Sequence, residues 1–300
     1  MVGTRSAPAA AISAVGKTHW TDAMDLVPEI ERNVAAALAE DVGSGDVTAA
    51  LMPESAKARA RVVARQDAVL CGQAWFDACF SKLDPAADIG WQVAEGARIS
   101  RGQTVCELSG KARALLTGER TALNFLQTLS AVATNTSRYV AAVAGTRAKI
   151  VDTRKTLPGL RAAEKYAVRV GGGVNHRMGL YDAILLKENH ITAAGGIRSA
   201  LAAARKAAGP GIWIQIEVET LDQLREALDG GAKMILLDNM DAPKMREAVK
   251  LAAGRAELEA SGGITIETLR AIAETGVDRI SIGSLTKDIE AVDFSMRFEN

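Results

Sequence analysis

The sequence has only three cysteines among 300 residues: Cys71, Cys79 and Cys106. They show no CxxC spacing, and an odd number of scattered cysteines argues against a disulfide framework or a structural zinc site. Aromatic residues are also scarce, at 4% of the chain. We therefore expect a protein of the reducing cytoplasm that depends on neither disulfides nor zinc.

The chain also lacks net charge, because 36 Lys and Arg residues balance 36 Asp and Glu residues. Nothing therefore draws the whole surface toward nucleic acid or an anionic membrane, and any cationic site must be local. No apolar run reaches the roughly 18 residues of a membrane span. We expect neither nucleic acid nor membrane as a partner. Residues 1–24, although rich in alanine, are too weakly apolar for a signal peptide and are expected to form a disordered tail.

What the chain does have is 48% apolar residues, enough for two moderate cores. Residues 25–130 mix a helical pattern that ends near Glu40 with short alternating strands and glycine turns, which indicates a small α+β domain. Residues 112–144 read as a long helical connector that is broken near "TNTS". Residues 131–285 then form a second domain, and we expect residues 286–300 to pack back on the first.

In the second domain, apolar runs alternate with helical patterns such as "TLDQLREALDGG", which is typical of parallel βα units. A polar residue follows each run. In a βα barrel the carboxyl ends of the strands converge on the active site, so these residues are expected to lie together. They are Asp152, Arg154, Lys155, Lys187, Glu219, Asp238, Ser261, Gly262, Gly263, Gly283 and Ser284.

The cations of this set predict a polyanionic substrate. Arg154, Lys155 and Lys187 are joined by His176 and Arg177 of "GGGVNHRMG", more positive charge than a neutral substrate needs. The planar fork of arginine suits carboxylates and phosphates, and lysine supplies a point charge. For His176, a structural role and a functional role remain equally open.

The carboxylates Glu219 and Asp238 have two interpretations: ion-pair partners of the nearby cations, or holders of Mg²⁺ together with substrate phosphates. The glycine turns "SGG" and "GSL" after the last two strands favour phosphate, because their backbone N–H groups can approach it closely.

Taken together, these motifs resemble those of the quinolinate phosphoribosyltransferase family, from about residue 25 to the end. Each motif is short, but the ordered set is specific. In order they are "EDVGSGDVT", "GERTALNFLQ", "DTRKTLPGLR", "GGGVNHRMGLYDAILLKENH", "EVET", "LLDN", "SGGI" and "IGSLT".

The resemblance implies an N-terminal α+β sandwich-like domain followed by an open, TIM-like α/β barrel, paired head to tail in a homodimer or a higher assembly of dimers. It also implies a reaction in which quinolinate and phosphoribosyl pyrophosphate give nicotinate mononucleotide, pyrophosphate and CO₂, on the route to NAD. Mg²⁺ is the implied cofactor.

The resemblance further implies roles for individual residues. Quinolinate is expected to contact Arg154, Lys155, His176, Arg177 and Lys187. Arg120 is expected to reach the neighbouring subunit's site. Glu219 and Asp238 would serve Mg²⁺ and phosphoribosyl pyrophosphate. The phosphate turns match Ser261, Gly262, Gly263, Gly283 and Ser284, with Lys287 where some members carry histidine.

Three other interpretations remain. A related phosphoribosyltransferase with another acceptor would be distinguished by a substrate panel. A lyase that forms an imine on Lys155 or Lys187 would be trapped by borohydride. A non-catalytic anion-binding module is disfavoured, because Glu219 and Asp238 would weaken anion binding unless a metal bridges them.

Overall fold

The computed structural model describes residues 25–299, which fall into two compact units. The first, called here the sandwich unit, comprises the described residues up to 135, residues 157–171 and those from 288 onward. The second, the barrel unit, comprises residues 136–156 and 172–287. The predicted tail, residues 1–24, lies outside the described residues. The limits inferred from the sequence, 25–130 and 131–285, stay predictions.

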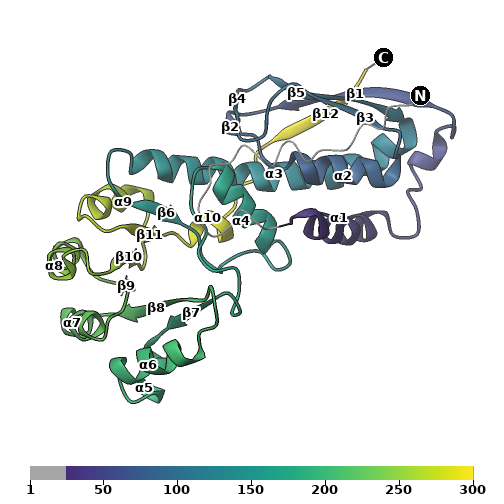
Figure 1. Cartoon of the computed structure of the whole chain (residues 1–300). Helices are drawn as coiled ribbons and strands as arrows, with labels where there is room; N and C mark the ends of the chain where they lie inside the picture. The colour runs from purple at the N-terminus through teal and green to yellow at the C-terminus, as the bar shows by residue number, and fades with distance from the viewer. Residues whose placement is uncertain (1–24, 300) are drawn as a thin grey trace, which may run out of the picture. The chain divides into compact units, whose positions relative to one another are not determined.

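The sandwich unit is built on an antiparallel sheet in the order β12-β1-β5-β3 (Figure 1). These strands are β12 (Phe294–Phe298), β1 (Lys57–Ala64), β5 (Thr104–Lys111) and β3 (Asp88–Trp91). A two-stranded ribbon joins β2 (Ala68–Val69) to β4 (Arg98–Ile99). The helical elements are α1 (Val27–Val42), η2 (Ala49–Leu51), α2 (Gln73–Leu83), the first part of α3 (Ala112–Ala142) and α4 (Arg161–Val170).

Helix α2 forms the core of this unit because its aromatic face is buried. Trp75, Phe76 and Phe80 are all fully buried. Phe76 meets Trp91 of β3 edge-on, with 5.2 Å between ring centroids. On its other side, Phe80 lies so near Gly118 of α3 that a Cβ there would come within 2.9 Å of its ring. Glycine at 118 therefore lets α3 approach α2 closely.

The break expected in α3 near "TNTS" is wrong, because the helix runs without interruption from Ala112 to Ala142. Threonines interrupt helices when their hydroxyls compete for backbone groups. Here the Thr134 hydroxyl donates to the Ser130 carbonyl at 2.6 Å and accepts the Val69 N–H of β2 at 2.8 Å. The same hydroxyl thus joins α3 to the β2–β4 ribbon, and this contact stabilises the continuous helix.

The barrel unit is a parallel sheet in the order β6-β11-β10-β9-β8-β7, curved with helices along its outside (Figure 1). Strands β6 and β7 are not paired with each other in the part of the chain that the structure describes, so the barrel is open. The strands are β6 (Lys149–Val151), β7 (Ala183–Leu186), β8 (Trp213–Val218), β9 (Met234–Asp238), β10 (Glu257–Ser261) and β11 (Arg279–Ser281). The helices are α5 (Glu188–Ala193), α6 (Ile197–Ala207), α7 (Leu221–Asp229), α8 (Ala242–Ala252), α9 (Ile266–Ala273) and α10 (Ser284–Lys287).

These strands confirm the mixed α/β class and the open barrel predicted from the sequence. Helices α7 and α8 begin where side chains cap them: the Thr220 hydroxyl accepts the Gln223 N–H and the Asp241 carboxylate accepts the Lys244 N–H. Across residues 25–299, no helix combines the length and apolarity needed to cross a bilayer.

Asp77 of α2 gives the sandwich unit a pH dependence. Its carboxylate accepts the Trp91 indole N–H at 2.9 Å. Burial, with the nearby Glu95 carboxylate adding to it, raises the pKa of Asp77 to about 6. A carboxyl whose folded-state pKa is raised contributes its stability at low pH, and that contribution is lost as pH rises through about 6.

We predict that Asp77→Asn raises the free energy of unfolding at pH 7.5 by roughly 1–3 kcal/mol, because the amide keeps an acceptor for Trp91 without a buried charge. The gain should shrink as pH falls toward 4.5, which urea unfolding at both pH values would measure. The exposed Asp88→Asn is the control. A gain that is independent of pH would contradict the explanation.

Candidate active site

The segment "DTRKT" leaves β6 at the carboxyl edge of the sheet and is fixed there by Lys155. The Lys155 carbonyl accepts the Thr286 hydroxyl at 2.8 Å, and its N–H donates to the Thr153 hydroxyl at 3.0 Å. Its side chain crosses Gly283, where an added Cβ would come within 3.0 Å of the lysine Cδ. Gly283 thus brings Lys155 to the turn after β11.

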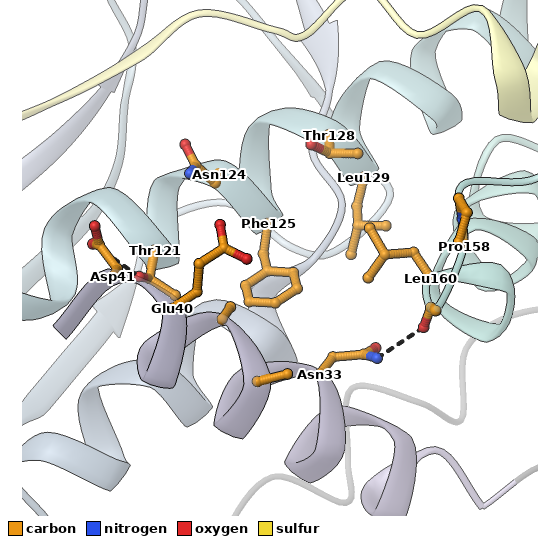
Figure 2. A pocket seen from close by; sticks show the side chains of 13 residues that line it. Asn33, Glu40, Asp41, Thr121, Asn124, Phe125, Thr128, Leu129, Pro158 and Leu160 are labelled. Carbon is orange, nitrogen blue, oxygen red and sulfur yellow. Dashed lines mark hydrogen bonds between the residues drawn. The ribbon is translucent and has the colours of Figure 1, made fainter. Parts of the chain in front are cut away.

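The end of this segment, residues 157–160, belongs to the sandwich unit and is held by two side chains. Glu164 of α4 accepts the Leu157 N–H at 3.2 Å, and burial raises the pKa of Glu164 to about 8. Asn33 of α1 donates to the Gly159 carbonyl at 3.0 Å (Figure 2). Pro158, Gly159 and Leu160 here line a groove of about 380 Å³ beside α1 and α3.

Two arginines interact at the start of the site. Burial and, second to it, the charge of Arg154 lower the pKa of Arg177, while Asp182 opposes the change. One Arg177 guanidinium nitrogen donates to the Ala183 carbonyl at 3.2 Å. The two like charges repel each other, so an anion that contacts both guanidinium groups would be stabilised.

Lys187 follows β7 and faces a carboxylate that the sequence reasoning missed, Glu217 of β8. The Lys187 ammonium lies 3.5 Å from the Glu217 carboxylate. Burial raises the pKa of Glu217; Lys187 opposes this, while Asp238 and Glu219 add to it. Alternation along a strand could have revealed Glu217, because it stands two residues after the inward-facing Gln215 and so lies on the same face of β8.

The three carboxylates do not by themselves form a metal cage. Within residues 25–299, no group of three or more His, Cys, Asp or Glu side chains is arranged to hold a metal ion. Glu219 is exposed, and Asp238 is half-buried. Hard oxygen ligands with concentrated negative charge do suit Mg²⁺, which commonly takes one or two protein carboxylates and completes its shell with phosphate oxygens and water.

Asp238 is oriented by its neighbour Asn239 and by the turn after β10. The Asn239 amide donates to the Asp238 carboxylate at 2.7 Å, and its N–H donates to the Ser261 carbonyl at 2.9 Å. A Cβ on Gly262 would overlap the Asn239 side-chain oxygen and lie 2.8 Å from its Cγ. Gly262 also has φ +108°, so this position requires glycine.

The turn after β11 carries the remaining residues expected to bind phosphate. Ser284 begins α10, with its hydroxyl 3.5 Å from that of Tyr139, and Lys287 ends the helix. The carboxyl ends of the six parallel strands lie at one edge of the barrel sheet. The residues that the sequence predicts at or after those ends therefore lie at that edge. Arg120 is exposed on α3 in the other unit.

His176 and Asp152 face inward. Asp152 is fully buried and accepts the His176 N–H at 2.7 Å and the Asn175 amide at 2.6 Å. The His176 ring is also buried, and both of its nitrogens have protein partners: Nδ1 accepts the Arg177 N–H at 2.8 Å, and Nε2 lies 2.9 Å from the Gln215 oxygen. The acidic residue of "DTRKT" thus ties β6 to the loop that carries Arg177.

A cation-rich edge with carboxylates and glycine turns, on an open α/β barrel, defines a class of enzyme that binds phosphorylated anions. The sequence matches the family described as quinolinate phosphoribosyl transferase, C-terminal domain, over residues 132–297 and its N-terminal domain over residues 46–130. The chain belongs to the quinolinate phosphoribosyltransferase family, and it is a transferase of the phosphoribosyltransferase class.

Individual relatives agree with this assignment. The chain is 45% identical over 257 residues to the probable nicotinate-nucleotide pyrophosphorylase [carboxylating] of Bacillus subtilis, covering 86% of this chain and 89% of that protein. It is 37% identical over 314 residues to quinolinate phosphoribosyltransferase [decarboxylating] 1 of Nicotiana glauca, covering 96% and 89%. The structure of the nicotinate-nucleotide pyrophosphorylase from Francisella tularensis matches with a TM-score of 0.88 at 42% identity, covering 91% and 96%.

We predict that Gly262→Ala lowers the free energy of unfolding by roughly 2–4 kcal/mol, because its Cβ has no room beside Asn239 and its φ is unfavourable. Gly263→Ala is the matched control, since its φ is +58° but its Cβ would meet nothing within 4 Å. The control should lose only about 1–2 kcal/mol. Equal losses in urea unfolding would show that the contact with Asn239 is unimportant.

Proposed function

We propose that the protein transfers the phosphoribosyl group of phosphoribosyl pyrophosphate to the ring nitrogen of quinolinate, with loss of CO₂, to give nicotinate mononucleotide and pyrophosphate. The observation that carries this proposal is the placement of Arg154, Lys155 and Lys187 at the carboxyl ends of strands of one parallel sheet, with Arg177 on the loop that Asp152 ties to β6. Quinolinate has two adjacent carboxylates, which is the ligand that such a group of cations would stabilise. The names of the relatives support the same substrate.

In this proposal, the chain contributes mainly positioning and electrostatics. Arg154, Lys155, Arg177 and Lys187 hold the two carboxylates so that the ring nitrogen faces the ribose C1. The glycine turns contact the phosphates through their backbone N–H groups. Once the nitrogen has become quaternary, its positive charge stabilises the carbanion left at C2 when the 2-carboxylate departs as CO₂. A proton from water then forms the C2–H bond, so no organic cofactor is needed.

Magnesium is the metal that we propose for this site. Asp238 and Glu219 would hold it, since they stand at the carboxyl ends of the neighbouring strands β9 and β8, and Glu217 adds negative charge nearby. When bound, Mg²⁺ would offset the charge that develops on the leaving pyrophosphate. Asn239 keeps the Asp238 carboxylate oriented for this role.

We also propose that the site is completed in a homodimer, with Arg120 supplied by the partner subunit. Each unit carries exposed apolar side chains: Leu116 lies one turn from Arg120 on α3, and Leu180 and Tyr181 follow Arg177. The turn that carries Leu180 and Tyr181 is ordered by Asp182, because the Asp182 carboxylate accepts the N–H groups of Met178 and Gly179. Burying both patches between two copies would remove apolar surface from water.

The cytoplasm is the compartment that we propose for this reaction. The three cysteines are free and buried, and burial raises the pKa of each thiol, which leaves them unreactive.

The acceptor is tested by measuring nicotinate mononucleotide formation with quinolinate and with nicotinate, each in the presence of phosphoribosyl pyrophosphate and Mg²⁺. We predict that kcat/KM for nicotinate is lower by about 10⁴-fold or more, because without the 2-carboxylate the acceptor loses the charge-assisted hydrogen bonds that orient its ring nitrogen. Comparable kcat/KM values for the two acids would favour a related phosphoribosyltransferase with another acceptor. The absence of product from either acid would overturn the proposal.

Sharing of the site is tested by mixing Arg120→Ala and Arg154→Ala after denaturation and refolding. Each variant alone should be nearly inactive. Random pairing makes half of the dimers mixed, each with one intact site of two, so activity should recover to about a quarter of wild type. If mixed dimers form but stay inactive, Arg120 does not act across the interface.

A further inference from the structure

A buried chain of hydrogen bonds crosses the interior of the barrel unit beneath the candidate site. It begins at His176, whose Nε2 is 2.9 Å from the Gln215 side-chain oxygen of β8. The Gln215 amide donates to Glu259 of β10 at 3.1 Å. Glu259 also accepts Arg279 Nε of β11 at 2.9 Å and the Ser281 hydroxyl. Both Gln215 and Glu259 are fully buried.

This chain has one consistent direction of donation. The Arg177 N–H donates to His176 Nδ1, so Nδ1 carries no proton and Nε2 must be the protonated nitrogen. Nε2–H then donates to the Gln215 oxygen, which leaves the amide of Gln215 to donate to Glu259. Each step fixes the next, because an amide or an imidazole can present a donor and an acceptor only on opposite sides.

Glu259 is the end that sets this direction. Its carboxylate has no donor of its own when ionised, and it receives three, from Gln215, Arg279 and Ser281. A neutral group at this position would have too few acceptor sites for all three donors. The anion at 259 therefore forces Gln215 to turn its oxygen toward the histidine.

His176 in this arrangement has no ring nitrogen left for a ligand of its own. Its ring is also packed edge-on against Trp213, with 5.0 Å between centroids. What it does provide is an acceptor for the backbone of Arg177, whose guanidinium donates to the Ala183 carbonyl at 3.2 Å. A backbone fixed at residue 177 limits where that guanidinium can lie.

We propose that Glu259 is a positioning residue: through Gln215, and through its own carboxylate oxygen 3.7 Å from His176 Nε2, it locks His176 as the Nε2–H tautomer and thereby fixes Arg177 for the dicarboxylate. In this account His176 supports Arg177 rather than contacting quinolinate itself. The part that concerns quinolinate rests on the proposed function; the tautomer does not.

The tautomer is measured by ¹⁵N NMR of histidine-labelled full-length protein. The chain has three histidines, so His19→Gln/His190→Gln leaves only His176. At pH 7, we expect a protonated Nε2 and an unprotonated Nδ1. Glutamine at 190 keeps an acceptor for the Lys187 N–H that His190 binds in the native chain. A protonated Nδ1 in this variant would overturn the proposal, whichever acid the enzyme uses.

Two substitutions in the same background test how the tautomer is set. Glu259→Gln should produce a mixture of tautomers, because one amide oxygen cannot accept from three donors and Gln215 is free to turn. Gln215→Glu places a second carboxylate beside the ring, and both nitrogens should then be protonated. Circular dichroism and thermal unfolding establish that each variant is folded. If Glu259→Gln does not fold, Gln215→Glu and the wild-type spectrum still decide the matter.

Kinetics separate positioning from a general structural role. Glu259→Gln should raise KM for quinolinate roughly tenfold to a hundredfold, as displaced binding groups do, and change KM for phosphoribosyl pyrophosphate by less than about twofold. Glu257→Gln is the matched control, on the same strand but outside the chain of hydrogen bonds, and should change neither. Equal losses for both substrates, or no loss with an altered tautomer, would overturn the proposal. An enzyme that ignores quinolinate would refute the proposed function and leave the NMR result standing.

Discussion

Gathering like charges at one edge of a sheet is the constraint on which the rest of the barrel unit depends. Arg154 and Arg177 repel each other, and burial makes that repulsion stronger than it would be in water. The protein must therefore hold these side chains in place when no anion is bound. Asp152, the Arg177 backbone contact to His176 and the Lys187–Glu217 ion pair each contribute to that restraint.

The parallel sheet explains why the location of many candidate residues could be predicted from the sequence. Each strand of such a sheet ends at the same edge, so the polar residue after each apolar run is placed near the others by topology alone. This logic found Asp238, Lys187 and the turn at Gly262. The same logic explains why Glu219 was predicted and Glu217 was missed. Glu219 follows β8, whereas Glu217 lies within the strand, where the rule for residues after a strand does not apply.

Other features depend on packing that the sequence does not display. Nothing in the local pattern around "TNTS" shows that the Thr134 hydroxyl meets the Val69 N–H, so a helix break was expected where none exists. Similarly, Gln215 and Glu259 lie in strands that read as mostly apolar. Their hydrogen bond spans from β8 to β10 past the intervening β9, which the local pattern does not show. The sequence therefore could not predict which distant residue a single polar side chain would contact.

The central claim is that the cationic edge recognises the two carboxylates of the acceptor, and Arg177→Ala tests it most directly. We predict that the Kd for quinolinate, measured by calorimetry, rises by roughly tenfold to a hundredfold, while that for phosphoribosyl pyrophosphate changes by less than about twofold. Arg198→Ala, on the exposed side of α6, is the control and should change neither value. Equal weakening of both ligands by Arg177→Ala would contradict the account.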